Sequence, residues 1–139
     1  MPSDNARPNI PRSRSEVVFI GPHRAGKSTL ATLLAARLGL PQVSLDQLRV
    51  NYYREIGYDA AAAERLRQTG GFLSLTRHWK PFEIYGVERV LADYRDCVFD
   101  FGAGHSVYDD AVQIERASRA LRSFRHVVLV LRQRRTAKR

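Results

Sequence analysis

The sequence predicts an α/β fold, a three-layer αβα sandwich with a parallel sheet between two layers of helices. Short apolar runs at 17–20, 97–99 and 127–131 have the length of buried strands, and 42–44, with Val43 at its centre, is predicted as a further short strand. Segments with helical features separate these runs, so a helix follows each strand before the next strand begins. Strands and helices alternate in this way when right-handed crossovers join the strands of one parallel sheet.

Composition indicates one domain with a buried core. The chain has 139 residues, of which 44% are hydrophobic. The single cysteine, Cys97, is expected to be buried in a strand, and one cysteine excludes an internal disulfide framework or a cysteine-built zinc site. The sequence has no signal peptide and no apolar run of about 20 residues, so we expect a cytoplasmic protein without membrane contact.

The net charge of +9 is concentrated at the two ends of the chain. Residues 1–15 carry +2 and residues 132–139 carry +5, which leaves +2 on residues 16–131. The first segment has three prolines and one large aliphatic residue, so we expect a disordered leader at 1–15, a domain at 16–131 and a basic tail at 132–139. Because the domain is nearly neutral, specific nucleic-acid binding is not expected.

The first predicted strand runs into a glycine loop at 21–29 and then into a helix. Its two glycines let successive backbone N–H groups point inward around an anion. Lys27 adds a positive charge for β- and γ-phosphates, Ser28 adds a hydroxyl for Mg²⁺, and the helix N-terminus faces the same anion. An ordinary glycine turn is the alternative, but such a turn does not need the Lys-Ser pair. The expected nucleotide-binding residues are Gly21, Pro22, His23, Arg24, Ala25, Gly26, Lys27, Ser28 and Thr29.

This stretch resembles the Walker A motif of P-loop nucleoside triphosphate-binding proteins. A chance match is expected in well under about 1% of chains of this size. The resemblance implies the P-loop nucleoside triphosphate hydrolase fold, with ATP and Mg²⁺ as ligands. The choice between ATP and GTP stays open, because the base-reading segment is not recognisable.

Asp46 follows the second predicted strand, 42–44. Ligands of open α/β sheets bind beyond the carboxyl ends of the strands, so Asp46 is expected to face the same crevice as the glycine loop. Alternatively, Ser44 or Asp46 caps the helix predicted over 47–53. Both roles can hold if Ser44 is the cap.

Residues 47–95 are expected to be helical. Asp59 caps a helix that stops at Gly70-Gly71, and a later helix begins near Pro81. A cluster of basic and aromatic residues lies between them. Its aromatic side chains either belong to the core, with the charges in solvent, or line a site for a small anionic or sugar-like acceptor. The cluster comprises Arg77, His78, Trp79, Lys80 and Phe82.

The third predicted strand ends at Asp100 and is followed by a glycine-rich loop. This pattern looks like a Walker B strand, whose carboxylate binds Mg²⁺ directly or through water. Gly102 and Gly104 are expected to allow a ligand close to the backbone, whereas His105 has no assigned role.

The last helix and strand complete the predicted sheet. Asp109 or Asp110 is expected to cap the helix, and the unbroken apolar run 127–131 is expected to be a buried strand.

Residues 16–131 as a whole resemble small-molecule P-loop kinases of the shikimate-kinase-like group. The glycine loop, Asp46 and the segment Gly102-Ala103-Gly104 carry the resemblance. In that group the aspartate contacts the acceptor hydroxyl and can help to remove its proton, and the glycine segment lies behind the acceptor.

The chain departs from that group at three points. A Phe-Arg pair that grips the shikimate carboxylate corresponds here to Phe82-Glu83, and a carboxylate would repel that substrate. Ala103 interrupts a triple glycine. The arginine-bearing lid and fifth strand of the group do not follow residue 131, so we expect slow turnover and self-association through the exposed edge of the fourth strand.

These observations together predict a Mg²⁺-dependent kinase that transfers the γ-phosphoryl group of ATP to a small hydroxyl compound. The expected catalytic residues are Lys27 and Asp46, and Ser28 and Asp100 are the expected metal ligands. Asp46, Gly102, Ala103 and Gly104 are expected to contact the acceptor. The alternatives are a nucleotide-binding module or ATPase without a phosphoacceptor, and a nucleic-acid binder that uses the basic tails.

Overall fold

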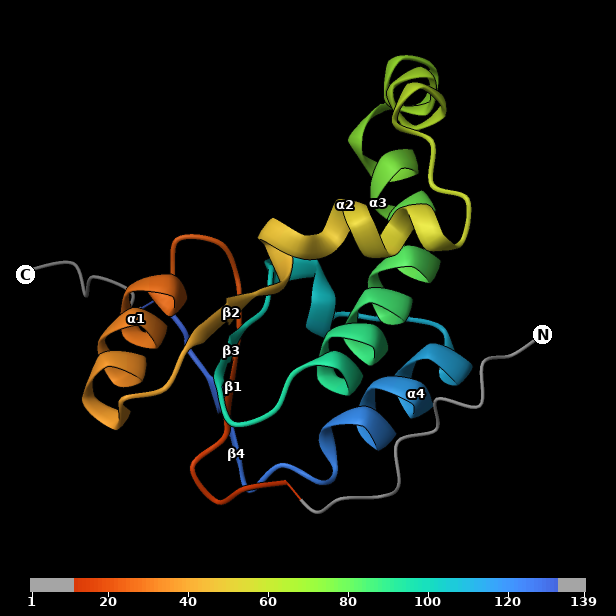
Figure 1. Cartoon of the computed structure of the whole chain (residues 1–139). Helices are drawn as coiled ribbons and strands as arrows, with labels where there is room; N and C mark the ends of the chain where they lie inside the picture. The colour runs from red at the N-terminus through yellow and green to blue at the C-terminus, as the bar shows by residue number, and fades with distance from the viewer. Residues whose placement is uncertain (1–11, 133–139) are drawn as a thin grey trace, which may run out of the picture.

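The computed structural model describes residues 12–132 and has a four-stranded parallel sheet in the order β2-β3-β1-β4 (Figure 1). The predicted α/β fold with alternating strands and helices is confirmed. The elements are β1 (Val17–Ile20), α1 (Lys27–Leu38), β2 (Gln42–Ser44), α2 (Leu45–Glu55), α3 (Ala60–Asp93), β3 (Val98–Asp100), the 3₁₀ helix η1 (Ala103–Ser106), α4 (Ala111–Leu121) and β4 (His126–Leu129).

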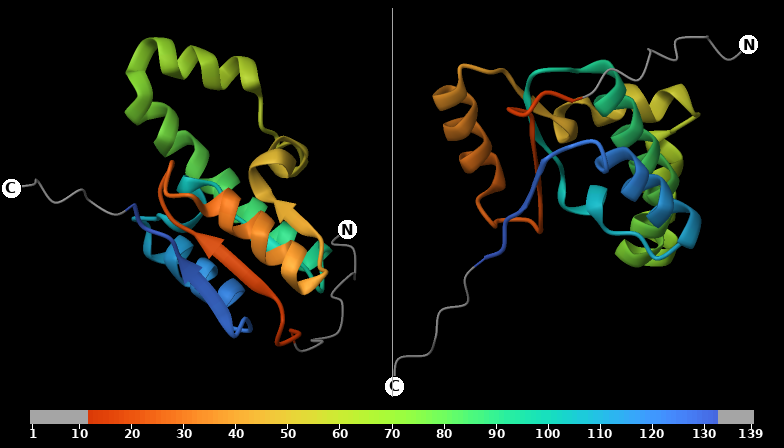
Figure 2. Two further views of the ribbon diagram at one scale, coloured as in Figure 1. Left: turned by 90° about the vertical axis from the view of Figure 1, so that its left-hand side faces the viewer. Right: turned by 90° about the horizontal axis from the view of Figure 1, so that it is seen from below.

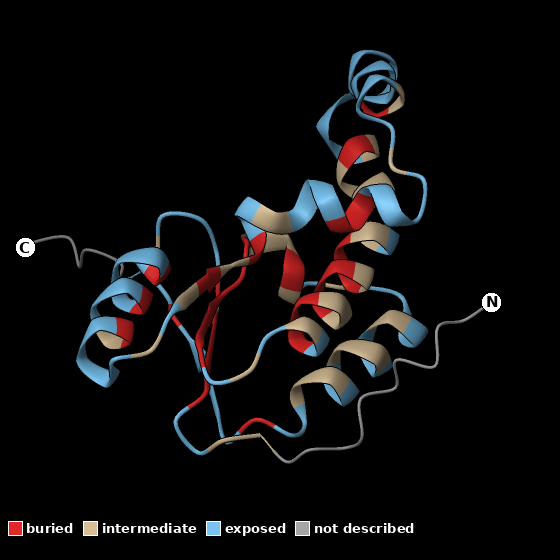
Figure 3. Cartoon of the chain, in the orientation of Figure 1, coloured by how far each residue is buried: buried red, intermediate tan, exposed pale blue. Residues whose placement is uncertain are grey.

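Helices cover the sheet on both faces, which makes three layers. Helix α1 lies on one face, and α3 and α4 lie on the other (Figures 1 and 2). Alternate residues of β1 point to opposite faces, so Val17 and Phe19 pack with Ala31 of α1, whereas Val18 packs in the cluster that includes Val90 of α3. The buried residues accordingly follow the central strands and the inner sides of the helices (Figure 3).

Cys97 belongs to this core, as expected. The residue is fully buried, and burial raises the pKa of its thiol to about 12. A thiol with this pKa stays protonated at neutral pH and packs as a small apolar side chain.

Segment α3 confirms one predicted boundary and corrects another. The predicted stop at Gly70-Gly71 is confirmed, because Gly71 has the non-helical angles φ 74° and ψ −170° and two helices meet there at a kink. The predicted start near Pro81 is wrong, since Pro81 lies inside the helix. Proline removes one backbone donor, and the packing of α3 against both α2 and α4 keeps the helix intact around it.

The helix caps agree with the sequence. The Asp59 carboxylate accepts a hydrogen bond of 2.9 Å from the Ala61 N–H at the start of α3. Of the two candidates for α4, Asp110 is the cap, and its carboxylate accepts from the Gln113 N–H at 3.0 Å.

The prediction of a buried fourth strand is wrong. All four residues of β4 are exposed, with Val127 and Val128 each 38% accessible and Leu129 57% accessible. The physical reason is its position, because β4 pairs only with β1 at one edge of the described sheet. An apolar run indicates a strand but does not tell whether other elements cover it.

Both predicted terminal segments lie mainly outside the described residues. Of the leader at 1–15, only residues 12–15 are described, and Arg12 contacts the domain through the Tyr94 carbonyl at 2.8 Å and Glu16 at 3.0 Å. Of the tail at 132–139, only Arg132 is described. No helix within the described range is long and apolar enough to cross a membrane.

Candidate functional site

The glycine loop leaves the carboxyl end of β1 and curls before α1 begins. Gly21 has φ 141°, and a Cβ atom there would lie 2.2 Å from the Val130 carbonyl oxygen, so only glycine fits. Arg24 and Gly26 also have positive φ, 60° and 91°, and Gly26 is the N-cap of α1. This succession of turns presents the loop backbone to the N-terminus of α1, where the first amides have no partners within the helix.

Lys27 is the first residue of α1, and its side chain folds back over the loop. It is buried, and its ammonium donates a hydrogen bond to the Pro22 carbonyl at 3.2 Å. A buried ammonium held above a ring of backbone amides is suited to bind a phosphate group.

Ser28 and Asp100 meet beside this ammonium. The Ser28 hydroxyl and the Asp100 carboxylate line the same cavity, and the hydroxyl lies near enough to favour the charged form of Asp100. Asp100 ends β3, which lies next to β1 in the sheet, with Phe19 and Asp100 in register. Burial raises the pKa of Asp100, whereas the charge of Lys27 and the Ser28 hydroxyl oppose this rise.

This pair fits the coordination of Mg²⁺ in nucleotide sites. Within residues 12–132, no three His, Cys, Asp or Glu side chains come together in a way that could hold a metal by themselves. Mg²⁺ usually needs only one or two protein oxygens, because phosphate oxygens and waters complete its octahedron. Ser28 and Asp100 would therefore hold a metal together with a nucleotide.

Asp46 lies in the first turn of α2, at the carboxyl end of β2. Ser44 is the N-cap of α2 but forms no side-chain capping bond, and Ser44 is in register with Asp100. The Asp46 carboxylate packs against the chain after β3, where a Cβ atom on Gly102 would lie 2.2 Å from Oδ1. The structure thus places Asp46 and Asp100 close together, beyond the carboxyl ends of the neighbouring strands β2 and β3.

Two neighbouring cavities share Asp46 and His23 in their walls. The first, the loop cavity, has a volume of about 400 Å³ and includes Lys27 and Asp100. The second has a volume of about 380 Å³ and lies toward α3, and it is named the acceptor cavity after the acceptor that the sequence predicts. The residues that line the acceptor cavity include Arg49, Thr76, Trp79, Lys80, Glu83, Ala103 and Gly104.

Glu83 and Lys80 form one wall of the acceptor cavity. Their charged groups are 3.2 Å apart, and Lys80 also donates to the Gly104 carbonyl at 3.0 Å. Glu83 is buried, which raises its pKa, while Lys80 opposes this effect. A Cβ atom on Gly104 would overlap the Glu83 carboxylate, so the close approach to this glycine is made by a side chain of the protein.

The cluster of aromatic and basic residues on α3 divides between the two predicted roles. Trp79 and Lys80 line the acceptor cavity. Phe82 instead contacts Tyr58 edge to face, and His78 packs against both rings, between α2 and α3. Arg77 is exposed. Neither interpretation alone describes the whole cluster.

His105 is a site residue that the sequence did not identify. The Gly102 N–H donates to its Nδ1 at 2.9 Å, and its Nε2 lies 2.8 Å from the Tyr53 hydroxyl. Because Nδ1 accepts a hydrogen bond, the neutral ring carries its proton on Nε2 and donates it to Tyr53. His105 thereby fixes the loop behind Asp46 to α2, a contact between distant segments that no local pattern indicates.

Burial lowers the pKa of His105 to about 4, with Arg49 and Lys80 also lowering it and Asp46 raising it. Between about pH 6.5 and pH 4 the His105 ring is protonated in the unfolded chain but stays neutral in the folded chain. The free energy of unfolding therefore falls as the pH falls. From pH 7 to pH 5 we expect the native chain to lose about 2 kcal/mol more than a His105→Gln variant. Denaturant unfolding at both pH values measures this difference, and equal losses in the two proteins would contradict it.

No family model matches the sequence, and no curated protein matches it. Among solved structures, the fold is similar to the P-loop kinase fold of shikimate kinases. The shikimate kinase from Acinetobacter baumannii in complex with shikimate is 18% identical, with a TM-score of 0.55 over 90% of this chain and 58% of that chain. The shikimate kinase from Aquifex aeolicus is 18% identical, with a TM-score of 0.52 over 82% of this chain and 58% of that chain. The likeness therefore spans less than two thirds of either kinase and concerns the fold alone.

Proposed function

We propose that the chain binds ATP with Mg²⁺ and transfers the γ-phosphoryl group to a small hydroxyl-bearing acceptor. The observation that carries this proposal is the pair of cavities that share Asp46. The glycine loop lines one cavity, and a mixture of polar and aromatic side chains lines the other. A phosphate donor and its acceptor need this kind of adjacency, because the transferred group passes in line between them.

The loop cavity supplies the groups that hold the nucleotide. Lys27 and the loop amides bind the β- and γ-phosphates and stabilise the charge that moves between them during transfer. Ser28 and Asp100 hold Mg²⁺, which neutralises the phosphate charge when it is bound.

Asp46 orients the acceptor. Its carboxylate hydrogen-bonds the acceptor hydroxyl and accepts the hydroxyl proton as the oxygen forms a bond to the γ-phosphorus. The bond from that phosphorus to the bridging oxygen breaks, and ADP leaves with the electron pair. Gly102, Ala103 and Gly104 support the acceptor side of the site, in which Gly102 keeps room for Asp46.

Glu83 makes shikimate an unsuitable acceptor. The similar Acinetobacter baumannii enzyme is in complex with shikimate, which carries a carboxylate. In this chain a buried carboxylate, paired with Lys80, forms the wall of the acceptor cavity. Arg49 and Lys80 balance Asp46 and Glu83, so the wall favours an uncharged or zwitterionic polyhydroxy compound over a carboxylate.

A search for the product tests the function directly. The purified chain and ATP-Mg²⁺ are added to a cell extract, and mass spectrometry looks for a small molecule that gains one phosphoryl group. The Lys27→Ala variant is the matched control, and the product should form only with the native chain. Loss of ATP without a phosphorylated product would favour an ATPase, and ATP binding without turnover would favour a binding module.

Self-association through β4 is proposed as well. The strand lies at the edge of the described sheet, its apolar side chains are exposed, and an uncovered edge pairs readily with a second strand. Because the chain carries a net charge of +9, we expect charge repulsion to limit this association at low salt. Light scattering should detect a larger mass at high salt, and a monomer at every salt concentration would refute the proposal. A Val128→Lys variant should stay monomeric.

A further inference from the structure

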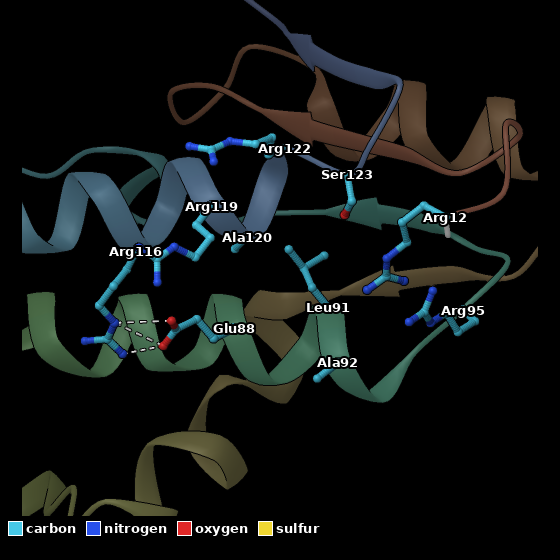
Figure 4. A pocket seen from close by; sticks show the side chains of 10 residues that line it. All are labelled: Arg12, Glu88, Leu91, Ala92, Arg95, Arg116, Arg119, Ala120, Arg122 and Ser123. Atoms are coloured by element: carbon cyan, nitrogen blue, oxygen red, sulfur yellow. Dashed lines mark hydrogen bonds and ion pairs between the residues drawn. The ribbon is translucent and has the colours of Figure 1, made fainter. Parts of the chain in front are cut away.

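A third cavity, of about 560 Å³, lies between α3 and α4 and is rich in arginine (Figure 4). Five arginines line it, and Glu88 supplies a carboxylate. Its volume is within the range of small-molecule sites, about 300–1,000 Å³. The five arginines are Arg12, Arg95, Arg116, Arg119 and Arg122.

This arginine cavity lies at the opposite end of the sheet from the glycine loop. Arg12 precedes β1, Arg95 precedes β3 and Arg122 precedes β4. These residues therefore lie near the amino ends of parallel strands, whereas the glycine loop and Asp46 follow the carboxyl ends. No residue that lines the arginine cavity lines the loop cavity or the acceptor cavity.

Arg12 and Arg95 form the first end of the cavity, where their guanidinium groups lie close to each other (Figure 4). Arg12 is fixed by Glu16 at 3.0 Å, by the Tyr94 carbonyl at 2.8 Å and by stacking on the Phe124 ring at 4.5 Å. Burial lowers the pKa of Arg12, the Glu16 carboxylate opposes this effect, and the charge of Arg95 adds to the lowering. Two guanidinium groups this close together present N–H donors that one oxyanion can bridge.

Three arginines form the second end, namely Arg116 and Arg119 of α4 and Arg122, which directly follows α4. Arg116 forms an ion pair with Glu88 across the groove (Figure 4). The Glu88 carboxylate offsets much of the positive charge of Arg116. Arg119 and Arg122 are highly exposed, and their contacts with Glu115 at 3.4 and 4.0 Å are weak surface pairs. Their guanidinium groups can turn toward a ligand at little cost.

The floor between the two ends is apolar. Leu91 and Ala92 of α3 and Ala120 of α4 line it. A guanidinium group binds carboxylate or phosphate with two parallel hydrogen bonds. The arrangement thus suits a molecule with oxyanion groups at its ends and a less polar part between them.

We propose that the arginine cavity binds a small organic anion with two or more carboxylate or phosphate groups. This site is independent of the proposed phosphoryl transfer, because it uses other residues at the other end of the sheet.

Calorimetric titration of the full chain tests this proposal. The Lys27→Ala variant serves as the background, so that the glycine loop does not compete for phosphate. Citrate is the carboxylate probe and tripolyphosphate is the phosphate probe, each at an ionic strength of about 0.1 M to screen diffuse attraction. We expect one site with a dissociation constant below about 1 mM for at least one probe, and the tighter probe identifies the oxyanion.

Two pairs of substitutions locate the site. Arg95→Gln with Arg119→Gln, one from each end, should weaken binding at least about tenfold. Arg37→Gln with Arg54→Gln removes the same charge from exposed positions elsewhere and should change binding less than about twofold. If the first pair unfolds the chain, the exposed pair Arg119→Gln with Arg122→Gln is tested in its place. The proposal then requires this pair to weaken probe binding at least about threefold. No binding of either probe, or equal weakening by the control pair, would overturn the proposal.

Discussion

Replacing Lys27 by alanine is expected to weaken ATP binding more than about tenfold, a cost above about 1.4 kcal/mol. The Lys27 ammonium is buried, and its hydrogen bond to the Pro22 carbonyl holds it over the glycine loop. The β- and γ-phosphates would concentrate negative charge at this point, where a fixed ammonium attracts them most strongly. Isothermal titration calorimetry with ATP and Mg²⁺ measures the loss.

An Arg37→Ala variant is the control for Lys27→Ala. Arg37 is exposed in the last turn of the same helix, so its removal changes the net charge equally without touching the loop. Its ATP affinity should stay within about twofold of the native value at moderate salt. If Lys27→Ala melts at the native temperature and binds ATP with unchanged affinity, the glycine loop is not a nucleotide site.

The features that the sequence predicts well depend on short stretches of chain. The curl of the glycine loop is dictated by Gly21 and Gly26, whose positive φ angles other residues rarely adopt. Asp46 follows β2 and Asp100 ends β3, and these two strands are neighbours in the sheet. The carboxyl ends of parallel strands lie on the same side of a sheet, so the proximity of the two aspartates follows from the fold class. Local pattern and topology together therefore locate most of the candidate site.

The features that the sequence does not predict depend on contacts between distant segments. His105 and Tyr53 are 52 positions apart, and neither belongs to a motif that indicates their hydrogen bond. The apolar run 127–131 by itself indicates a buried strand, and the exposed edge of β4 is expected only through the resemblance to kinases that have a further strand beside it.

The arginine cavity shows the same limitation for charge. Counted along the chain, the domain is nearly neutral, so no cluster of basic side chains is expected on its surface. Folding nevertheless brings Arg12 beside Arg95 and places α4 arginines across the groove from α3, while many carboxylates lie elsewhere. Local charge density depends on the fold, and a sum over the sequence averages it out.

Replacing Asp46 by asparagine is expected to reduce phosphoryl transfer by about 10²–10⁴ while ATP binding stays within about twofold. Asparagine keeps the size of the side chain that packs against Gly102 and can still cap a helix, but it cannot accept the proton of the acceptor hydroxyl. The rate of product formation in the extract assay and calorimetry with ATP measure the two effects.

Asp100→Asn is the comparison that separates the two aspartates. Asp100 lies beside Ser28 and Lys27, so its loss should raise the Mg²⁺ concentration needed for ATP binding, whereas Asp46→Asn should leave that concentration unchanged. If Asp46 served only the stability of α2, Asp46→Asn would spare both transfer and the melting temperature, whereas Asp46→Ala would lower the melting temperature by several degrees and still spare transfer. That result would assign Asp46 to the stability of α2 and leave the proposed kinase without its proton acceptor.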